Sequence, residues 1–268
     1  DFYYEPPSGY LALCTDNLSA PEIKLPGDHF NTVIWSGDNT TPRTITGAGF
    51  QPDLVWTKDR TNVRNHIWWD VIRTFAGNKG ISSNSNAIEG DSASSTYGYV
   101  SAAAADGFTV TGGSDGSYPY RYVNQTSTNY AAWNWLAGGS GVANTTGTMD
   151  STVSANTTAG FSIVKYVGHS NGASNGTVGH GLSEAPTMIF WKELTVAGSN
   201  WNAYQSDVGK AERLELNTND AEASDTYMMH NTLPTASVFS VGDSGETNSS
   251  GDDHVAYCFH SVEGYSKI

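Results

Sequence analysis

The chain has 268 residues, of which 38% are hydrophobic and 12% aromatic, so it can bury at least one sizeable core. Its 27 acidic and 13 basic residues give a formal net charge of -14, which repels phosphate and disfavours nucleic acid as a partner. No apolar run approaches the roughly 20 residues that a bilayer span requires, so we expect no membrane insertion.

The first 28 residues differ in composition from the rest of the chain. Tyr4–Asn17 combines one extended apolar run with several proline breaks. We interpret residues 1–28 as the end of a preceding domain or as a linker. Residues 264–268 follow a predicted strand directly, so we expect the chain to be part of a longer protein.

Two later parts of the chain resemble each other. Four pairs of segments match in the same order: Phe30–Gly37 with Phe161–Gly168, Gly49–Lys58 with Gly181–Lys192, Gly107–Gly112 with Val238–Gly242, and Tyr130–Trp135 with His254–Phe259. This self-similarity predicts two copies of one structural unit, over residues 29–137 and 161–268. Residues 138–160 are rich in Gly, Ser, Thr and Asn, which predicts a connector with one strand near residues 149–153.

Apolar side chains alternate within each copy, as in Ala131, Trp133 and Trp135. Alternation of this kind predicts strands with one buried face and one face in water. Short strands broken by turns such as Gly112–Gly116 favour antiparallel sandwiches over βαβ units. The predicted fold class is therefore all-β, with two tandem antiparallel β-sandwich repeats.

Aromatic side chains provide the candidate binding residues. Trp68 and Trp69 are adjacent on a predicted strand and must point to opposite faces. The pattern of Ile67, Trp69 and Val71 predicts that Trp69 is core, which leaves Trp68 for ligand contact or for packing against the other repeat. The candidate ligand-binding residues are Trp68, His66, Asp70, Trp201 and Tyr204. In the exposed interpretation, Trp68→Ala weakens partner or ligand binding and leaves the fold intact.

Two further sets of residues are expected to be structural. Trp56 and Trp191 stand in nearly equivalent places in the two copies, close to Lys58 and Lys192, which favours packing over ligand contact. Histidines are expected in loops or on strand surfaces, at positions His180, His254 and His260.

Metal and redox chemistry have little support in the sequence. The two cysteines, Cys14 and Cys258, lie in no CxxC or Cys/His pattern, so we expect two isolated, partly buried thiols, with a disulfide between them as the alternative. Oxygen-rich loops at 114–117 and 248–253 are candidate calcium sites, although the spacing of an EF-hand is missing. We predict no metal site and no cofactor, with calcium at these loops as the alternative.

Four segments give the chain a family resemblance. They are Pro7–Leu18, Gly49–Lys58, Thr152–Val164 and Val255–Lys267. These segments resemble concanavalin A-like lectin/glucanase-type modules of marine bacteriophage structural and fibre proteins, with Pro7–Leu18 similar to the last strand of an upstream SPRY-like sandwich. The resemblance implies a jelly-roll fold and a virion location. It also leads us to expect a glycine directly after Arg73, where this chain has Thr74.

Catalysis has weaker support than binding. Glucanases of this fold carry two carboxylates on one strand face, because an acid and a base or nucleophile must flank the scissile bond. That run is missing here, since Glu184 and Glu193 are isolated in the sequence.

We therefore expect a non-enzymatic virion structural protein, a fibre or capsid-surface component at the virion surface or otherwise extracellular. Its expected partners are copies of itself, other virion proteins and a host-surface glycan. The alternative is a secreted carbohydrate-active enzyme or its carbohydrate-binding module. A third hypothesis is a purely architectural spacer.

Overall fold

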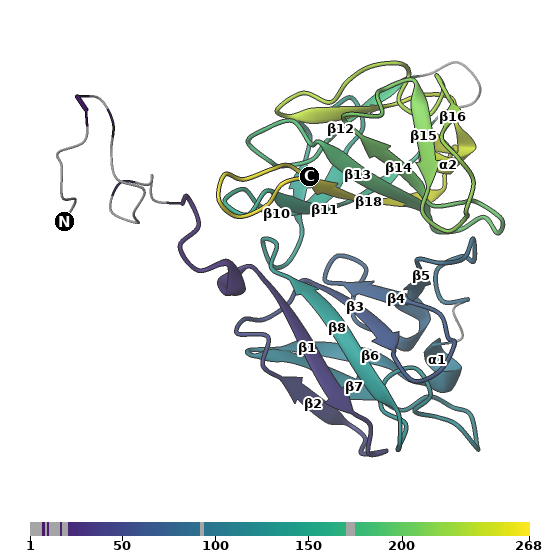
Figure 1. Ribbon diagram of the computed structural model, residues 1–268. Coiled ribbons are helices and arrows are strands. Elements are labelled where there is room, and N and C mark those ends of the chain that lie inside the picture. Colours follow the sequence, from purple (N-terminus) through teal and green to yellow (C-terminus); the bar gives the residue numbers. More distant parts are fainter. Residues whose placement is uncertain (1–6, 9, 11–16, 18–20, 92–93, 170–174) are drawn as a thin grey trace.

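Figure 1 shows the computed structural model of the chain, which describes residues 7, 8, 10, 17, 21–91, 94–169 and 175–268. Strands in antiparallel sheets dominate the described residues, with the one-turn helices α1 (Ser94–Tyr97) and α2 (Gly245–Asn248) and the short 3-10 turns η2 (Pro26–Asp28) and η3 (Gly77–Lys79). The predicted all-β class is confirmed. No helix within the described ranges is long and apolar enough to cross a membrane.

The first half of the chain forms two facing sheets. Their strands are β1 (Phe30–Ser36), β2 (Arg43–Thr46), β3 (Leu54–Asp59), β4 (Ile67–Asp70), β5 (Ile81–Ser82), β6 (Tyr99–Ala104), β7 (Gly107–Thr111) and β8 (Asn129–Trp135). The larger sheet has the order β1-β8-β3-β4-β5 and the smaller one β2-β7-β6. Alternate side chains of both sheets meet in a core that includes Val33, Trp69 and Phe108, so the predicted burial of Trp69 is confirmed.

The second half also pairs a large sheet with a small one. Its strands are β9 (Val142–Asn144), β10 (Ser151–Asn156), β11 (Phe161–Val167), β12 (Gly176–Gly179), β13 (Met188–Glu193), β14 (Asn202–Gln205), β15 (Glu212–Glu215), β16 (Ala223–Ser224), β17 (Val238–Val241) and β18 (Asp253–Phe259). The large sheet has the order β16-β15-β14-β13-β18-β11-β10-β9, and β12 pairs with β17. Their core includes Trp191, Tyr204 and Phe239.

The segment between the halves is part of a sheet. Residues 138–160 contain β9 and β10, and β10 pairs with β11 along its whole length, from Ser151 opposite Tyr166 to Asn156 opposite Phe161. The strand expected near residues 149–153 corresponds to β10. This segment therefore continues the second large sheet instead of only spanning a gap.

Strands pair in the same order in the two halves. β8 lies between β1 and β3, just as β18 lies between β11 and β13. In the small sheets β2 pairs with β7, and β12 pairs with β17.

The register corrects one expected equivalence. Lys58 lies opposite Ala131 and Lys192 opposite Val255, which agrees with the sequence match of these lysines. Trp56, however, precedes Lys58 by two residues, whereas Trp191 directly precedes Lys192. Consecutive strand residues point to opposite faces. Trp191 is therefore buried in the second core, while Trp56 packs at the junction between the halves.

The two large sheets stack against each other through their outer faces. A third buried cluster draws side chains from both halves, among them Leu54, Trp68, Phe161, Tyr257 and Phe259. In Figure 1 the two sandwiches lie one above the other with β8 and β18 on the facing sheets. The expectation that one face of each strand is in water is therefore wrong for these strands, which are covered on both sides.

Lys192 is a fully buried amine in β13. Its Nζ donates to the carbonyl oxygens of Glu193 at 2.6 Å and Ser199 at 3.0 Å, which ties the strand to the turn that follows. Burial lowers the pKa of Lys192 to about 8, although the charges of Glu193 and Glu246 oppose this shift.

Because of Lys192, the free energy of unfolding of the protein should rise as the solution becomes mildly alkaline. Lys192 loses its proton near pH 8 in the folded chain but only near pH 10.5 in the unfolded chain. Between these two values the unfolded chain holds more protons, so the free energy of unfolding rises with pH. The gain is complete above pH 10.5 and is lost as the pH falls towards 8. Between pH 7.5 and 9.5 the wild type should gain about 2 kcal/mol in free energy of unfolding relative to Lys192→Met, measured by urea denaturation. Parallel stability curves for the two proteins would show that the amine keeps its ordinary pKa.

Candidate functional site

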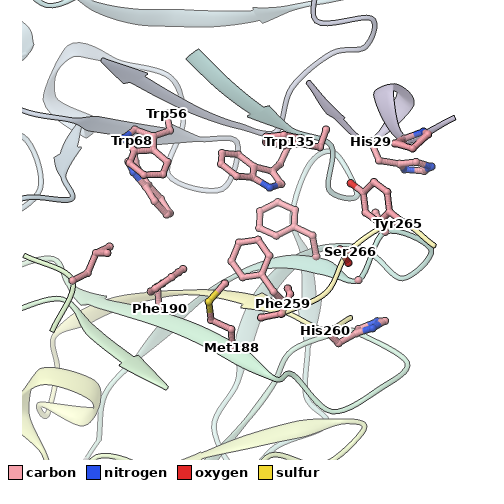
Figure 2. Close-up of a pocket in the computed structure, with 17 residues that line it drawn as sticks. His29, Trp56, Trp68, Trp135, Met188, Phe190, Phe259, His260, Tyr265 and Ser266 are labelled. Carbon is pink, nitrogen blue, oxygen red and sulfur yellow. The ribbon is translucent and has the colours of Figure 1, made fainter. Parts of the chain in front are cut away.

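A cavity of about 490 Å³ lies at the junction of the two halves (Figure 2). The first half contributes Phe30, Trp56, Trp68 and Trp135, and the second half contributes Phe161, Met188, Phe190 and Phe259. The volume is that of a small-ligand pocket, and the walls are almost entirely carbon. Neither half makes this site alone.

Strand register places the aromatic walls. Phe30 of β1 lies opposite Trp135 of β8, with ring centroids 4.9 Å apart. Trp56 of β3 lies opposite Trp68 of β4, with centroids 5.1 Å apart. Residues directly opposite each other on paired strands share one face of the sheet. Trp68 adjoins the core residue Trp69, so this face is the one turned away from the first core and toward the second half.

Apart from the indole N–H groups of the tryptophans, the polar side-chain groups of the cavity stand at one end (Figure 2). His29 and Tyr265 approach each other there, with ring centroids 6.1 Å apart, beside Ser266 and His260. Asn156 contacts the Nδ1 atom of His29 at 3.0 Å. This end of the cavity is therefore amphipathic, while the rest of the lining is aromatic and aliphatic.

A buried ionic network lies beside the cavity and joins the two halves. Arg73 donates from Nε to Asp70 at 2.6 Å and from Nη1 to Glu89 at 3.1 Å. Tyr257 of β18 donates its hydroxyl to the same Asp70 oxygen at 2.6 Å. Burial opposes the charge of Arg73, but the attraction of Asp70, with Tyr257 and Glu89, holds its pKa above the ordinary value. For Tyr257, burial raises the pKa, so its hydroxyl keeps its proton and stays a donor.

The loop after Arg73 contains a residue in the left-handed region. Thr74 has φ of 69°, at the position where the family resemblance predicts glycine. Glycine adopts this conformation without strain, whereas a β-branched residue does so rarely. The backbone at Thr74 therefore has the conformation that a glycine would favour, directly after the Arg73 of the ionic network.

The structure separates the five predicted site residues. Trp68 lines the cavity but is only 2% exposed, and it packs against Trp201 and Tyr257, with ring centroids 5.3 and 4.8 Å away. Asp70 is fully buried in the ionic network. The expected exposure of Trp68 is therefore wrong, and the indole packs against the second half of the chain; a role of Trp68 in ligand binding stays a prediction.

The other three predicted residues lie outside the cavity lining. Trp201 is buried, and its Nε1 donates to the carbonyl of Ser82 at 2.8 Å across the junction. Tyr204 belongs to the second core. His66 is half-buried, with its ring 6.1 Å from that of Trp56, and burial together with the charge of Lys58 lowers its pKa.

The histidine prediction is correct in part. His180 and His260 lie in loops, as expected, but both of them and His254 of β18 are buried, and burial lowers the pKa of His180 and His254. Cys258 is a free thiol in the second core, and burial raises its pKa. Cys14 lies outside the described residues.

Metal-ligand clusters are also missing from the described ranges. No group of three His, Cys, Asp or Glu side chains there has the arrangement of a metal site. In the 114–117 loop, Asp115 accepts from the backbone N–H groups of Ser117 and Tyr118. In the 248–253 loop, Asp252 bonds to Ser249. These acids stabilise turns.

The fold and the cavity define an all-β protein of stacked antiparallel sheets with an aromatic pocket at their junction. The chain belongs to the family described as "Domain of unknown function (DUF7483)", whose match covers residues 25–268. No curated protein and no solved structure matches the chain.

Proposed function

We propose that the chain is a non-catalytic structural protein of a bacteriophage virion, built from two tandem jelly-roll repeats of concanavalin A type. In this proposal the repeats form one rigid unit, and the cavity at their junction receives an apolar group of a neighbouring virion protein. The aromatic cavity is the observation that carries the proposal.

The pairing of strands supports the tandem repeat. The four pairs of matched sequence segments correspond to β1 and β11, β3 and β13, β7 and β17, and β8 and β18. β8 lies between β1 and β3 as β18 lies between β11 and β13, and β7 pairs with β2 as β17 pairs with β12. Two unrelated sandwiches would have no reason to share both the sequence matches and the strand order. Duplication of one module accounts for both.

The chemistry of the walls favours an apolar protein group over a sugar. A sugar carries hydroxyl groups around its ring, and each loses free energy when it is buried without a hydrogen-bond partner. Away from the end that holds His29 and Ser266, the polar side-chain groups of the lining are the indole N–H groups of the tryptophans, which donate hydrogen bonds but do not accept them. Leu, Met or aromatic side chains of a partner would fill the rest without that cost.

Bonds across the junction support a rigid unit. The backbone N–H of Glu89 donates to the carbonyl of Leu194 at 3.0 Å, and that of Gly198 donates to Asn86 at 3.2 Å. Together with the Tyr257–Asp70 bond, they fix the two sandwiches at several points. A protein that carries mechanical load in a particle, or that holds other components at a fixed distance, requires such stiffness.

Glu193 has a structural task in this arrangement. Its carboxylate accepts from the backbone and hydroxyl of Thr195 and from the backbone of Val196. It therefore stabilises the turn between β13 and β14, and the hydrolase alternative gains no support from this residue.

A matched pair of surface leucines tests the proposal. Leu216 lines the cavity and is 37% exposed, whereas Leu233 is 51% exposed and lies away from it. Leu216→Asp should reduce the number of copies in purified particles at least tenfold, because a charge in the cavity wall opposes burial of an apolar partner group. Leu233→Asp should be incorporated like the wild type, with mass spectrometry as the measurement. Particles that lack the wild-type chain, or that take up both variants equally, would refute the proposal.

A further inference from the structure

A tyrosine-framed arginine lies at the other end of the first sandwich. The guanidinium carbon of Arg121 is 4.7 Å from the ring centroid of Tyr97 and 4.7 Å from that of Tyr118. Tyr118 is 49% exposed, and Arg121 is partly exposed. Arginine stacks on aromatic faces while its N–H groups still donate to an acceptor in the ring plane.

Arg121 has no direct ion pair among the described residues, although the charge of Asp115 lies close enough to interact with it. Arg43, Arg64 and Arg73 each form an ion pair with an aspartate, at 3.2, 3.1 and 2.6 Å. For Arg121 no ion pair or side-chain hydrogen bond occurs in the part of the chain that the structure describes, and its buried Nε lacks an acceptor. An immobilised guanidinium without a direct ion pair is a candidate site for a single carboxylate.

The loop that carries Arg121 is held in place before any ligand arrives. Asp115 accepts from the backbone N–H of Tyr118 at 2.6 Å, and the N–H of Tyr122 donates to the carbonyl of Tyr97 at 3.0 Å. Arg64 donates from Nη1 to the carbonyl of Arg121 at 2.6 Å. Binding would therefore lose little free energy to the ordering of this loop.

We propose that Arg121, with Tyr118 and Tyr97, binds a carboxylate-bearing sugar. A carboxylate matches the planar fork of the guanidinium, and the apolar face of a sugar ring can lie on the exposed ring of Tyr118. Neutral sugars lack the charge that Arg121 requires, and the acidity of the chain opposes polyanionic nucleic acid.

This site is independent of the cavity. Tyr130, at the start of β8, donates its hydroxyl to the carbonyl of Arg121 at 3.0 Å, while Trp135, at the end of the same strand, lines the cavity. The strand rises about 3.3 Å per residue, so the two sites lie roughly 17 Å apart or more. Loss of one site leaves the other unaffected.

Calorimetric titration of the full chain with the methyl glycoside of galacturonic acid, which carries a single carboxylate, tests the proposal, with methyl galactoside and acetate as comparison ligands. The galacturonide should bind, and both comparison ligands should bind at least tenfold more weakly. Arg121→Met should weaken galacturonide binding at least tenfold, and Tyr118→Ala severalfold. Arg121→Lys, which keeps the charge but loses the fork, should fall between Arg121→Met and the wild type.

Arg60 provides the matched control, because it is an exposed arginine of the same sandwich. Arg60→Met should bind the galacturonide like the wild type. Equal losses in Arg60→Met and Arg121→Met would mean general charge attraction and would overturn the proposal. So would equal affinity for the neutral methyl galactoside, or no binding of the galacturonide to a wild-type chain whose thermal unfolding shows it to be folded. None of these outcomes bears on the particle assay for the cavity.

Discussion

Replacement of Arg73 by methionine should lower the free energy of unfolding by about 3–5 kcal/mol. The reason lies in the groups that Arg73 leaves behind. Among the described residues, the fully buried Asp70 would keep the Tyr257 hydroxyl and the backbone N–H of residue 73 as donors, and Glu89 would keep Lys79. An uncompensated buried carboxylate is costly, although the methionine itself fits an apolar site. Chemical denaturation at pH 7 measures the change.

Arg43→Met is the control for this experiment. Arg43 also pairs with an aspartate, but Arg43 and Asp38 have side chains that are 27% and 48% exposed. An ion pair in contact with water contributes at most about 1 kcal/mol. Equal effects of the two substitutions would mean that water reaches the Asp70 network.

Trp68→Ala should destabilise the protein by about 3–5 kcal/mol, which reverses the expectation from the sequence. The indole is 2% exposed and packs among Trp56, Trp201 and Tyr257. Its removal deletes contacts on both sides of the junction and enlarges the cavity beside it. Thermal and chemical unfolding followed by circular dichroism report the loss.

Tyr227→Ala separates this effect from the general loss of an aromatic ring. Tyr227 is 65% exposed, and truncation of exposed side chains usually changes stability by about 0.5 kcal/mol or less. A Trp68→Ala protein as stable as Tyr227→Ala would show that the junction closes over the missing indole or that the two halves do not stack in solution.

Local patterns in the sequence predicted much of the sandwiches. Alternation identified strands such as β8 and β18, and the matched segments identified their counterparts in the other half. Trp69 was placed correctly because Ile67 and Trp69 share one face of β4 with the first core. These features depend on neighbours along one strand, which a sequence displays directly.

The junction was harder to predict, because it depends on residues more than a hundred positions apart in the chain. Trp68 was interpreted as a binding residue since the sheet that covers it comes from the other half. One signal was present: Val255–Phe259 is apolar at five consecutive positions, which is typical of a strand covered on both faces. The same reasoning would have directed attention to Phe259 and Trp135, which line the cavity.

The strands that the connector contributes decide where this molecule can be divided. A fragment that starts at Phe161 would lose β9 and β10 and would present the bare backbone of β11 as a sheet edge. Such an edge recruits other chains and promotes aggregation. A fragment that starts ahead of Val142 keeps that edge closed, but it still exposes Phe161, Tyr257 and Phe259 where the first half had covered them. Fragments that contain one half alone would therefore expose apolar side chains and tend to aggregate. The smallest stable unit is the two halves together.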